Sequence, residues 1–120
     1  MKRLVAITII AGVIGPAAAP AMASPGACSS QRTAVKADRA KLKADNATLK
    51  ADRGAIKADR QQLKKDKATS DATAVAADQA KLKADVTQWR ADRKTRRADF
   101  NQYHHDHRAL RECRRANTGP

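Results

Sequence analysis

Large apolar residues and aspartates each recur every seven residues along most of this chain. The apolar column consists of Leu42, Leu49, Ile56, Leu63, Val75, Leu82, Trp89, Tyr103 and Leu110, with Arg96 as a polar interruption. The aspartate column consists of Asp38, Asp45, Asp52, Asp59, Asp66, Asp71, Asp78, Asp85, Asp92, Asp99 and Asp106. A seven-residue repeat keeps each residue type on one line of an α-helix, so the pattern predicts long, striped helices.

One step in the aspartate repeat, from Asp66 to Asp71, is only five residues long. In a continuous helix this shortening would rotate the stripes by about 200°, at roughly 100° per residue, and would destroy any face shared by both halves. Thr69, Ser70 and Asp71 are residue types that favour the start of a helix. We therefore predict a helix over 31–67, a turn over 68–71, a second helix over 72–115 and a flexible tail over 116–120.

The two cysteines, Cys28 and Cys113, are equally distant from this break, because the midpoint of their numbers is 70.5. A chain that folds back at the break brings them together, and we expect them to form a disulfide in an oxidising compartment. Closing so long a loop is worth roughly 4–5 kcal/mol on a chain-entropy estimate. The predicted fold class is all-α, with two long heptad-repeat helices in an antiparallel, coiled-coil-like hairpin closed by this disulfide. The alternative is one long rod with free or intermolecular thiols.

Each helix has two narrow apolar edges, since a column of alanines lies about 155° from the large apolar residues on a heptad wheel. The alanines are Ala37, Ala44, Ala51, Ala58, Ala77, Ala84, Ala91 and Ala98. With the cysteines as mirror points, residue n faces residue 141 − n, so Leu63 is expected opposite Asp78 and the large residues interleave. Aspartates flank the apolar column, so antiparallel pairing brings like charges together. A parallel homo-oligomer, which would set aspartates beside the partner's arginines, remains the competing arrangement.

Residues 1–23 have the pattern of a secretory signal peptide. The basic pair Lys2 and Arg3 precedes an apolar stretch that is too short to span a bilayer, and Ala21-Met22-Ala23 provides a small-residue cleavage site. Residues 24–30 read as a linker, and no second long apolar segment follows. We expect cleavage after Ala23 and a secreted or periplasmic protein without a transmembrane segment.

The charge of the chain is strongly positive, at +13. Without Lys2 and Arg3 it is +11, because 23 basic residues then face 12 acidic ones. With one Trp, one Tyr and one Phe, the chain has too few large side chains for a wide globular core. An exported polycation of this shape is expected to act by structure and interaction, on an anionic polymer or the envelope surface.

The basic residues form stripes along both predicted helices. The residues predicted to bind anions are Lys36, Arg39, Lys43, Lys50, Arg53, Lys57, Arg60, Lys64, Arg90, Arg93, Lys94 and Arg97. We interpret the aspartate column as a counterweight that holds these stripes on the other side of each helix, so that a ladder of cations faces a linear polyanion. In the competing interpretation, the Lys and Arg stems only cover the apolar column and keep a thin rod in solution.

The sequence is also compatible with two functions other than polyanion binding. His104 and His107 are three residues apart and can share a helix face, so they are the candidate ligands for a metal-binding or stress-buffering role. The cationic helices could also act on membranes. The chain has no phosphate-binding Gly-rich loop, nucleophile elbow or paired glutamates, so neither an enzyme activity nor a cofactor is predicted.

Overall fold

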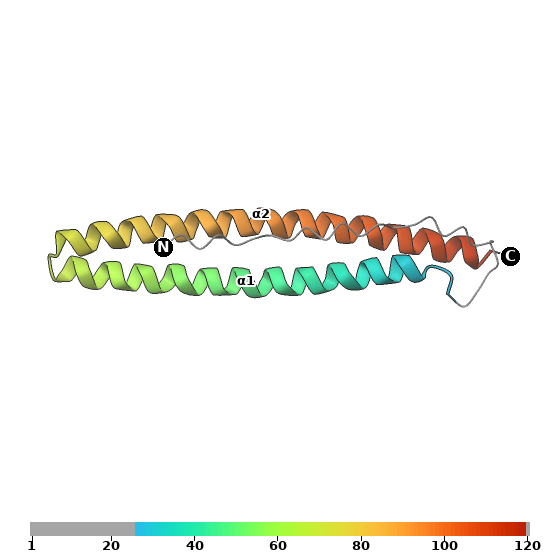
Figure 1. Ribbon diagram of the computed structural model, residues 1–120, viewed down its shortest axis with the longest axis horizontal. Coiled ribbons are helices and arrows are strands. Elements are labelled where there is room, and N and C mark those ends of the chain that lie inside the picture. The colour runs from blue at the N-terminus through green and yellow to red at the C-terminus, as the bar shows by residue number, and fades with distance from the viewer. Residues whose placement is uncertain (1–25, 120) are drawn as a thin grey trace, which may run out of the picture.

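The computed structural model describes residues 26–119 and shows two long antiparallel helices joined by a short turn (Figure 1). Helix α1 spans Ser29–Ala68 and helix α2 spans Ala72–Asn117. This arrangement confirms the predicted all-α helical hairpin. The predicted signal peptide, 1–23, lies outside the described residues. Within the described part of the chain, neither helix offers the continuous apolar length that a membrane crossing requires.

The turn between the helices provides partners for several of the backbone groups that the two helix ends leave unpaired. Ser70 adopts a left-handed conformation with φ 57°, and its amide donates to the carbonyl of Lys67 over 3.2 Å. The amide of Asp71 donates to the carbonyl of Asp66 over 3.4 Å, which completes a Schellman motif at the end of α1. The Asp71 carboxylate then caps α2 by accepting from the amide of Ala74 over 3.1 Å. The five-residue step in the aspartate repeat is therefore a helix stop followed directly by a helix start.

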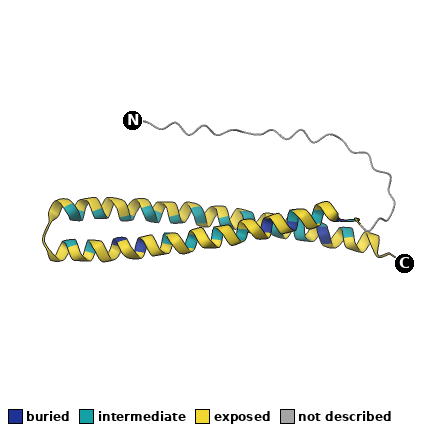
Figure 2. Cartoon of the chain, turned by 60° about the horizontal axis from the view of Figure 1, so that its bottom comes forward, coloured by how far each residue is buried: buried dark blue, intermediate teal, exposed yellow. Residues whose placement is uncertain are grey.

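The contact between α1 and α2 is a narrow seam in which apolar residues alternate with aspartates. Figure 2 shows the buried and half-buried positions following the inner sides of both helices. On α1 the seam residues are Val35, Asp38, Leu42, Asp45, Leu49, Asp52, Ile56, Asp59, Leu63 and Asp66. On α2 they are Val75, Asp78, Leu82, Asp85, Trp89, Asp92, Arg96, Asp99, Tyr103, Asp106, Leu110 and Cys113. Steps of three and four alternate, so aspartate occupies one of the two interface positions of every heptad except the last of α2, where Cys113 takes that place.

Aspartates of the two helices meet in five pairs across this seam. The pairs, each within hydrogen-bonding reach, are Asp38 with Asp106, Asp45 with Asp99, Asp52 with Asp92, Asp59 with Asp85, and Asp66 with Asp78. Residue n of α1 therefore lies level with residue 144 − n of α2. The expected contact between like charges of the two helices is present. It lies inside the interface rather than at its flanks, and Asp38 and Asp59 are each only 4 % exposed.

Three sequence-based expectations about packing are wrong. Asp78 faces Asp66 rather than Leu63, because Cys28 precedes the first helical residue in a left-handed conformation, φ 68°, and so does not share the helical register. The alanine column is exposed on both helices and forms no second apolar edge. The aspartates do not act as a counterweight on an outer face, since the coiled-coil spacing that buries the apolar column buries them too.

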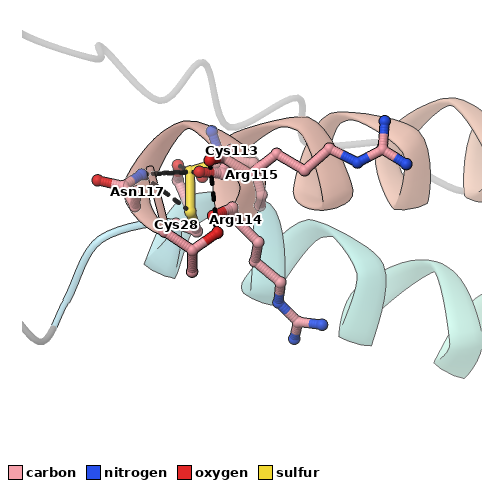
Figure 3. The surroundings of a disulfide bond; sticks show 8 residues. Cys28, Cys113, Arg114, Arg115 and Asn117 are labelled. Atoms are coloured by element: carbon pink, nitrogen blue, oxygen red, sulfur yellow. Dashed lines mark hydrogen bonds between the residues drawn. A yellow bond between two sulfur atoms is a disulfide. The ribbon is translucent and has the colours of Figure 1, made fainter. Parts of the chain in front are cut away.

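The open end of the hairpin contains the disulfide between Cys28 and Cys113, whose Cα atoms are 5.9 Å apart (Figure 3). Cys28 packs with Val35 and Leu110 in a small buried cluster, and Cys113 contacts the edge of this cluster. The Asn117 side-chain amide donates to the carbonyl of Cys113 over 2.8 Å. The disulfide therefore joins the last turn of α2 to the residue that precedes α1.

Candidate polyanion-binding groove

A groove runs along one side of the seam and is lined by both helices. From α1 its lining residues are Asn46, Leu49, Lys50, Arg53, Ile56, Lys57, Arg60, Gln61 and Lys64. From α2 they are Val86, Trp89, Arg90, Arg93, Arg96, Arg97 and Phe100. Two hollows make up this basic groove, and they share Arg53 and Trp89, so the surface is continuous.

The heptad explains why cations from both helices reach the same groove. Apart from Lys94, each residue of the basic stripes directly follows a seam residue, as Arg53 follows Asp52 and Arg90 follows Trp89. Such positions lie on one flank of the seam, and antiparallel pairing brings the corresponding flanks of the two helices together. The two stripes therefore form the two walls of one groove.

The basic groove contains nine cationic side chains and no carboxylate among its lining residues. The cations are Lys50, Arg53, Lys57, Arg60, Lys64, Arg90, Arg93, Arg96 and Arg97. Within residues 26–119, the ion pairs join Lys81 to Asp59 and His105 to Asp106, and neither involves a groove residue. Among the described residues, the nine groove cations therefore form no ion pair.

The floor of the groove is apolar and partly aromatic. Ile56 is 9 % exposed and Trp89 is half-buried, so both contribute to the seam as well as to the groove. The Arg93 guanidinium lies over the Trp89 ring, 4.8 Å from its centroid. Phe100 is 42 % exposed at one end of the groove. The floor can therefore support stacking or apolar contact, while the walls supply charge.

Two irregularities of the sequence pattern contact each other in this groove. Arg96 interrupts the apolar column, and Asn46 is the one uncharged member of the basic stripe of α1. The Arg96 Nε donates to the Asn46 Oδ1 over 2.6 Å. This hydrogen bond gives the half-buried guanidinium a neutral partner. The hydrogen bond does not neutralise the positive charge of Arg96, which lies near the seam carboxyl Asp45 as well as in the groove lining.

Eight of the twelve predicted anion-binding residues line the groove. Lys94 lies beside it, in a shallow hollow with Arg90, Arg93 and Arg97. The other three, Lys36, Arg39 and Lys43, are exposed on α1 nearer the open end, outside the groove. The sequence indicates Arg96 only as an interruption of the apolar column and does not predict that it also lines the groove. The one indication in the sequence was that Arg96 directly precedes Arg97, a residue of the basic stripe of α2.

The histidines lie outside the groove, near the open end. His104 packs edge-on against Phe100, with ring centroids 4.4 Å apart, and His107 stacks against Tyr103 at 5.6 Å. Within residues 26–119, no three histidine, cysteine or acidic side chains are placed to hold one metal ion. Cys113 is committed to the disulfide. The structure thus gives His104 and His107 aromatic neighbours and no third ligand in the part of the chain that it describes.

Comparisons with protein-family models, with curated proteins and with solved structures gave no match to this chain. A functional assignment therefore depends on the arrangement of the chain's own side chains.

Proposed function

We propose that this protein is an exported polyanion-binding protein whose hairpin holds the basic groove in a fixed shape. The groove binds a linear polymer that carries closely spaced phosphate groups. The observation that carries the proposal is the separation of charge between seam and groove. Ten aspartates face one another inside the seam, and nine cations line the groove without a carboxylate.

This separation is difficult to explain as a device for solubility alone. Lys and Arg stems that only cover an apolar seam are equally effective when their charges are paired with acidic neighbours, as on most helix surfaces. Here the acidic residues are withdrawn from the cations, and the resulting self-repulsion opposes folding. A bound polyanion removes that repulsion.

The dimensions of the groove suit a linear ligand. Along α1 the lining residues extend from Asn46 to Lys64, which corresponds to about 27 Å at 1.5 Å per residue. Cations recur on each turn at about 5.4 Å, and a single phosphodiester strand places its charges about 3.4 Å apart. Arginine guanidinium groups bind phosphate through paired hydrogen bonds. A phosphate polymer several units long can therefore contact both walls at once.

Export is supported by the residues at the start of the chain and by the disulfide. The 1–23 segment has the features of a cleavable signal, and disulfides persist mainly in oxidising compartments. We therefore place the protein outside the cytoplasm. There its partners include phosphate-rich wall polymers, extracellular nucleic acid and polyphosphate.

Trp89 is the one tryptophan of the chain and lies in the groove, so its fluorescence reports binding directly. Titration with inorganic polyphosphate is expected to change the Trp89 emission. The affinity is expected to fall about 100-fold between 50 and 200 mM salt, as about five phosphate contacts require at a slope of roughly 0.7 per contact. The measurement is the dissociation constant at four salt concentrations.

A neutral polymer of similar length, such as polyethylene glycol, is the control and leaves the emission unchanged. An affinity for polyphosphate that is independent of salt contradicts the proposal, since counterion release requires a steep dependence. Tighter binding to vesicles of anionic phospholipid than to any phosphate polymer contradicts the linear ligand and assigns the groove to membrane surfaces.

A further inference from the structure

The five aspartate pairs are a buried arrangement that polyanion binding does not use. Each pair contributes one carboxylate oxygen that is fully buried and has no hydrogen-bond donor other than the facing carboxyl group. These oxygens are the Oδ2 atoms of Asp38, Asp45, Asp52, Asp59 and Asp78. Two ionised carboxylates in contact repel each other and offer no donor, whereas a protonated carboxyl donates to an ionised one. The buried oxygens of each pair therefore gain a hydrogen bond when the pair holds one proton.

Neighbouring donors distinguish the two members in four of the five pairs. Gln62, Gln88 and Gln102 donate to Asp66, Asp92 and Asp106 over 3.0–3.1 Å, each from four residues earlier on the same helix. Lys81 of α2 donates to Asp59 of α1. A carboxylate that accepts such bonds is favoured in its ionised form. The proton therefore belongs on the opposite members, which are Asp78, Asp52, Asp38 and Asp85.

The pKa directions agree with this assignment. Burial, followed by the hydrogen bond to the facing carboxyl, raises the pKa of Asp38 and Asp52. The hydrogen bond to the facing carboxyl, followed by burial, raises the pKa of Asp78 and Asp85. Burial also raises the pKa of Asp45, so every pair contains one such group.

The partners shift the opposite way where a donor holds them. The hydrogen bond from Lys81 lowers the pKa of Asp59, and hydrogen bonds from Asp78 and Gln62 lower that of Asp66. Hydrogen bonds from His105 and Gln102 lower the pKa of Asp106. In each of these three pairs the pKa values of the two members are therefore shifted in opposite directions.

The charged groups near the aspartate pairs come from both helices and differ from one pair to the next. The cations are Lys41 at Asp38, Arg96 at Asp45, Lys65 at Asp66, and Lys81 at Asp59, Asp78 and Asp85, and the His105 ring lies beside Asp106. The acidic groups from neighbouring pairs are Asp99 at Asp38, Asp92 at Asp45, Asp85 at Asp52 and Asp59 at Asp78. Asp52 is influenced only by the acidic groups Asp92 and Asp85. The Asp52–Asp92 pair therefore depends most on its proton.

We propose that the five aspartate pairs form a proton-holding ladder that makes closure of the hairpin dependent on pH. Because the basic groove has one wall on each helix, the ladder also controls the groove, and this second step rests on the proposed function. In the protonated state each pair joins α1 to α2 by a hydrogen bond. Loss of the protons leaves two like charges at every level of the seam, and the helices separate while the disulfide keeps their ends together.

The direction of the pH effect follows from the two kinds of shift. A carboxyl whose pKa is raised by folding contributes stability that is lost as pH rises through that raised pKa. A carboxylate whose pKa is lowered contributes stability that is lost as pH falls through that lowered pKa. The hairpin is therefore most stable in the acidic interval between the two values of each pair, and its stability decreases towards alkaline pH.

Thermal unfolding, followed by the helical circular dichroism signal with the disulfide intact, tests the ladder without any polyanion. The melting temperature of the wild-type chain is expected to fall as the pH rises from the acidic range through the raised pKa values of the ladder carboxyls. In Asp52→Asn the amide donates to Asp92 at every pH. This variant is expected to melt about 5 °C above the wild type at alkaline pH and close to it at acidic pH.

Asp71→Asn is the matched control, because it removes one negative charge at the turn, outside the ladder, and asparagine also caps helices. It is expected to follow the wild-type profile. A melting temperature that does not change with pH, or an Asp71→Asn profile equal to that of Asp52→Asn, overturns the proposal. A rise in the wild-type melting temperature on adding calcium at alkaline pH also overturns it, because the pairs would then hold cations.

Groove control is tested separately, by polyphosphate binding at acidic and alkaline pH. The affinity of the wild type is expected to fall at least 10-fold more than that of the triple variant Asp38→Asn, Asp52→Asn, Asp85→Asn. Equal losses in the two proteins overturn the coupling. If polyphosphate binds at neither pH while the melting temperature still depends on pH, the proposed function fails and the ladder remains.

Discussion

Replacement of Cys28 and Cys113 by serine is expected to lower the free energy of unfolding by about 4.5 kcal/mol, on the chain-entropy estimate for a loop of 85 residues. The effect is large for this chain because the rest of the interface is thin. Among the described residues, only Cys28, Val35, Ile56 and Leu110 are buried apolar side chains. Aspartates occupy ten of the 22 seam positions, and they contribute little apolar burial.

The measurement is urea unfolding of the double variant and the wild type, followed by the helical signal near pH 5. Reduction of the wild type is expected to reproduce the loss, and the same reductant is expected to leave the double variant unchanged. A double variant that is as stable as the oxidised wild type would show that the seam holds the hairpin without the disulfide, contrary to the burial pattern.

The triple variant Arg53→Gln, Arg90→Gln, Arg93→Gln is expected to bind polyphosphate 10- to 100-fold more weakly than the wild type. These arginines come from both walls of the groove, and none is in an ion pair within the described residues. Three lost phosphate contacts reduce the slope of log affinity against log salt by about 2, at roughly 0.7 per contact. The measurement is fluorescence anisotropy of labelled polyphosphate, because loss of Arg93 also changes the surroundings of Trp89.

Arg32→Gln, Arg108→Gln, Arg115→Gln is the matched control, with the same chemistry and the same loss of three charges on exposed residues outside the groove. Its affinity is expected to remain within about threefold of the wild type, because charges beyond the Debye length of about 10 Å are screened. Equal weakening in the two triple variants would mean that total charge, rather than the groove, determines binding.

Both the fold and the disulfide could be predicted because each follows from the spacing of residues along the sequence. The heptad predicts long helices, and the five-residue step between Asp66 and Asp71 predicts the reversal. Cys28 and Cys113 are placed symmetrically enough about that step to predict the bond between them. None of these inferences requires knowledge of side-chain contacts.

The register and the role of the aspartates could not be predicted in the same way. A shift of three residues in the pairing, from 141 − n to 144 − n, depends on the backbone of Cys28 and Ser70, whose left-handed conformations no sequence motif announces. Acidic residues are rarely buried, so the sequence predicts the aspartates on a flank of the apolar column rather than inside the seam. Only the pairing of α1 with α2 in the structure shows that each seam aspartate has a facing aspartate as a hydrogen-bonding neighbour.

The candidate groove was predictable in composition but not in shape. The two basic stripes were visible in the sequence, and eight of the predicted residues line the groove. Their meeting on one side of the seam follows only from the antiparallel pairing. The contact of Arg96 with Asn46 likewise joins two positions that are 50 residues apart. Such contacts depend on register, which composition does not determine.

Burial of the aspartates and exposure of the cations are two consequences of one helix pairing. If the ladder pairs hold one proton each, five of the 12 acidic side chains are neutral, and the charge of residues 24–120 rises from +11 to +16. The seam that closes the hairpin therefore also strengthens the field of the groove. The two proposals are physically linked, although each has its own test.

The most direct test of the groove is a map of backbone amide shifts by nuclear magnetic resonance during titration of the oxidised, mature chain with polyphosphate. If the groove binds the polymer, the largest shifts are expected within 46–64 of α1 and 86–100 of α2, on residues that line the groove. The exposed alanines of the same helices, such as Ala51 and Ala84, are expected to shift little. Largest shifts on the alanine faces, or equal shifts along both whole helices, would contradict binding in the groove.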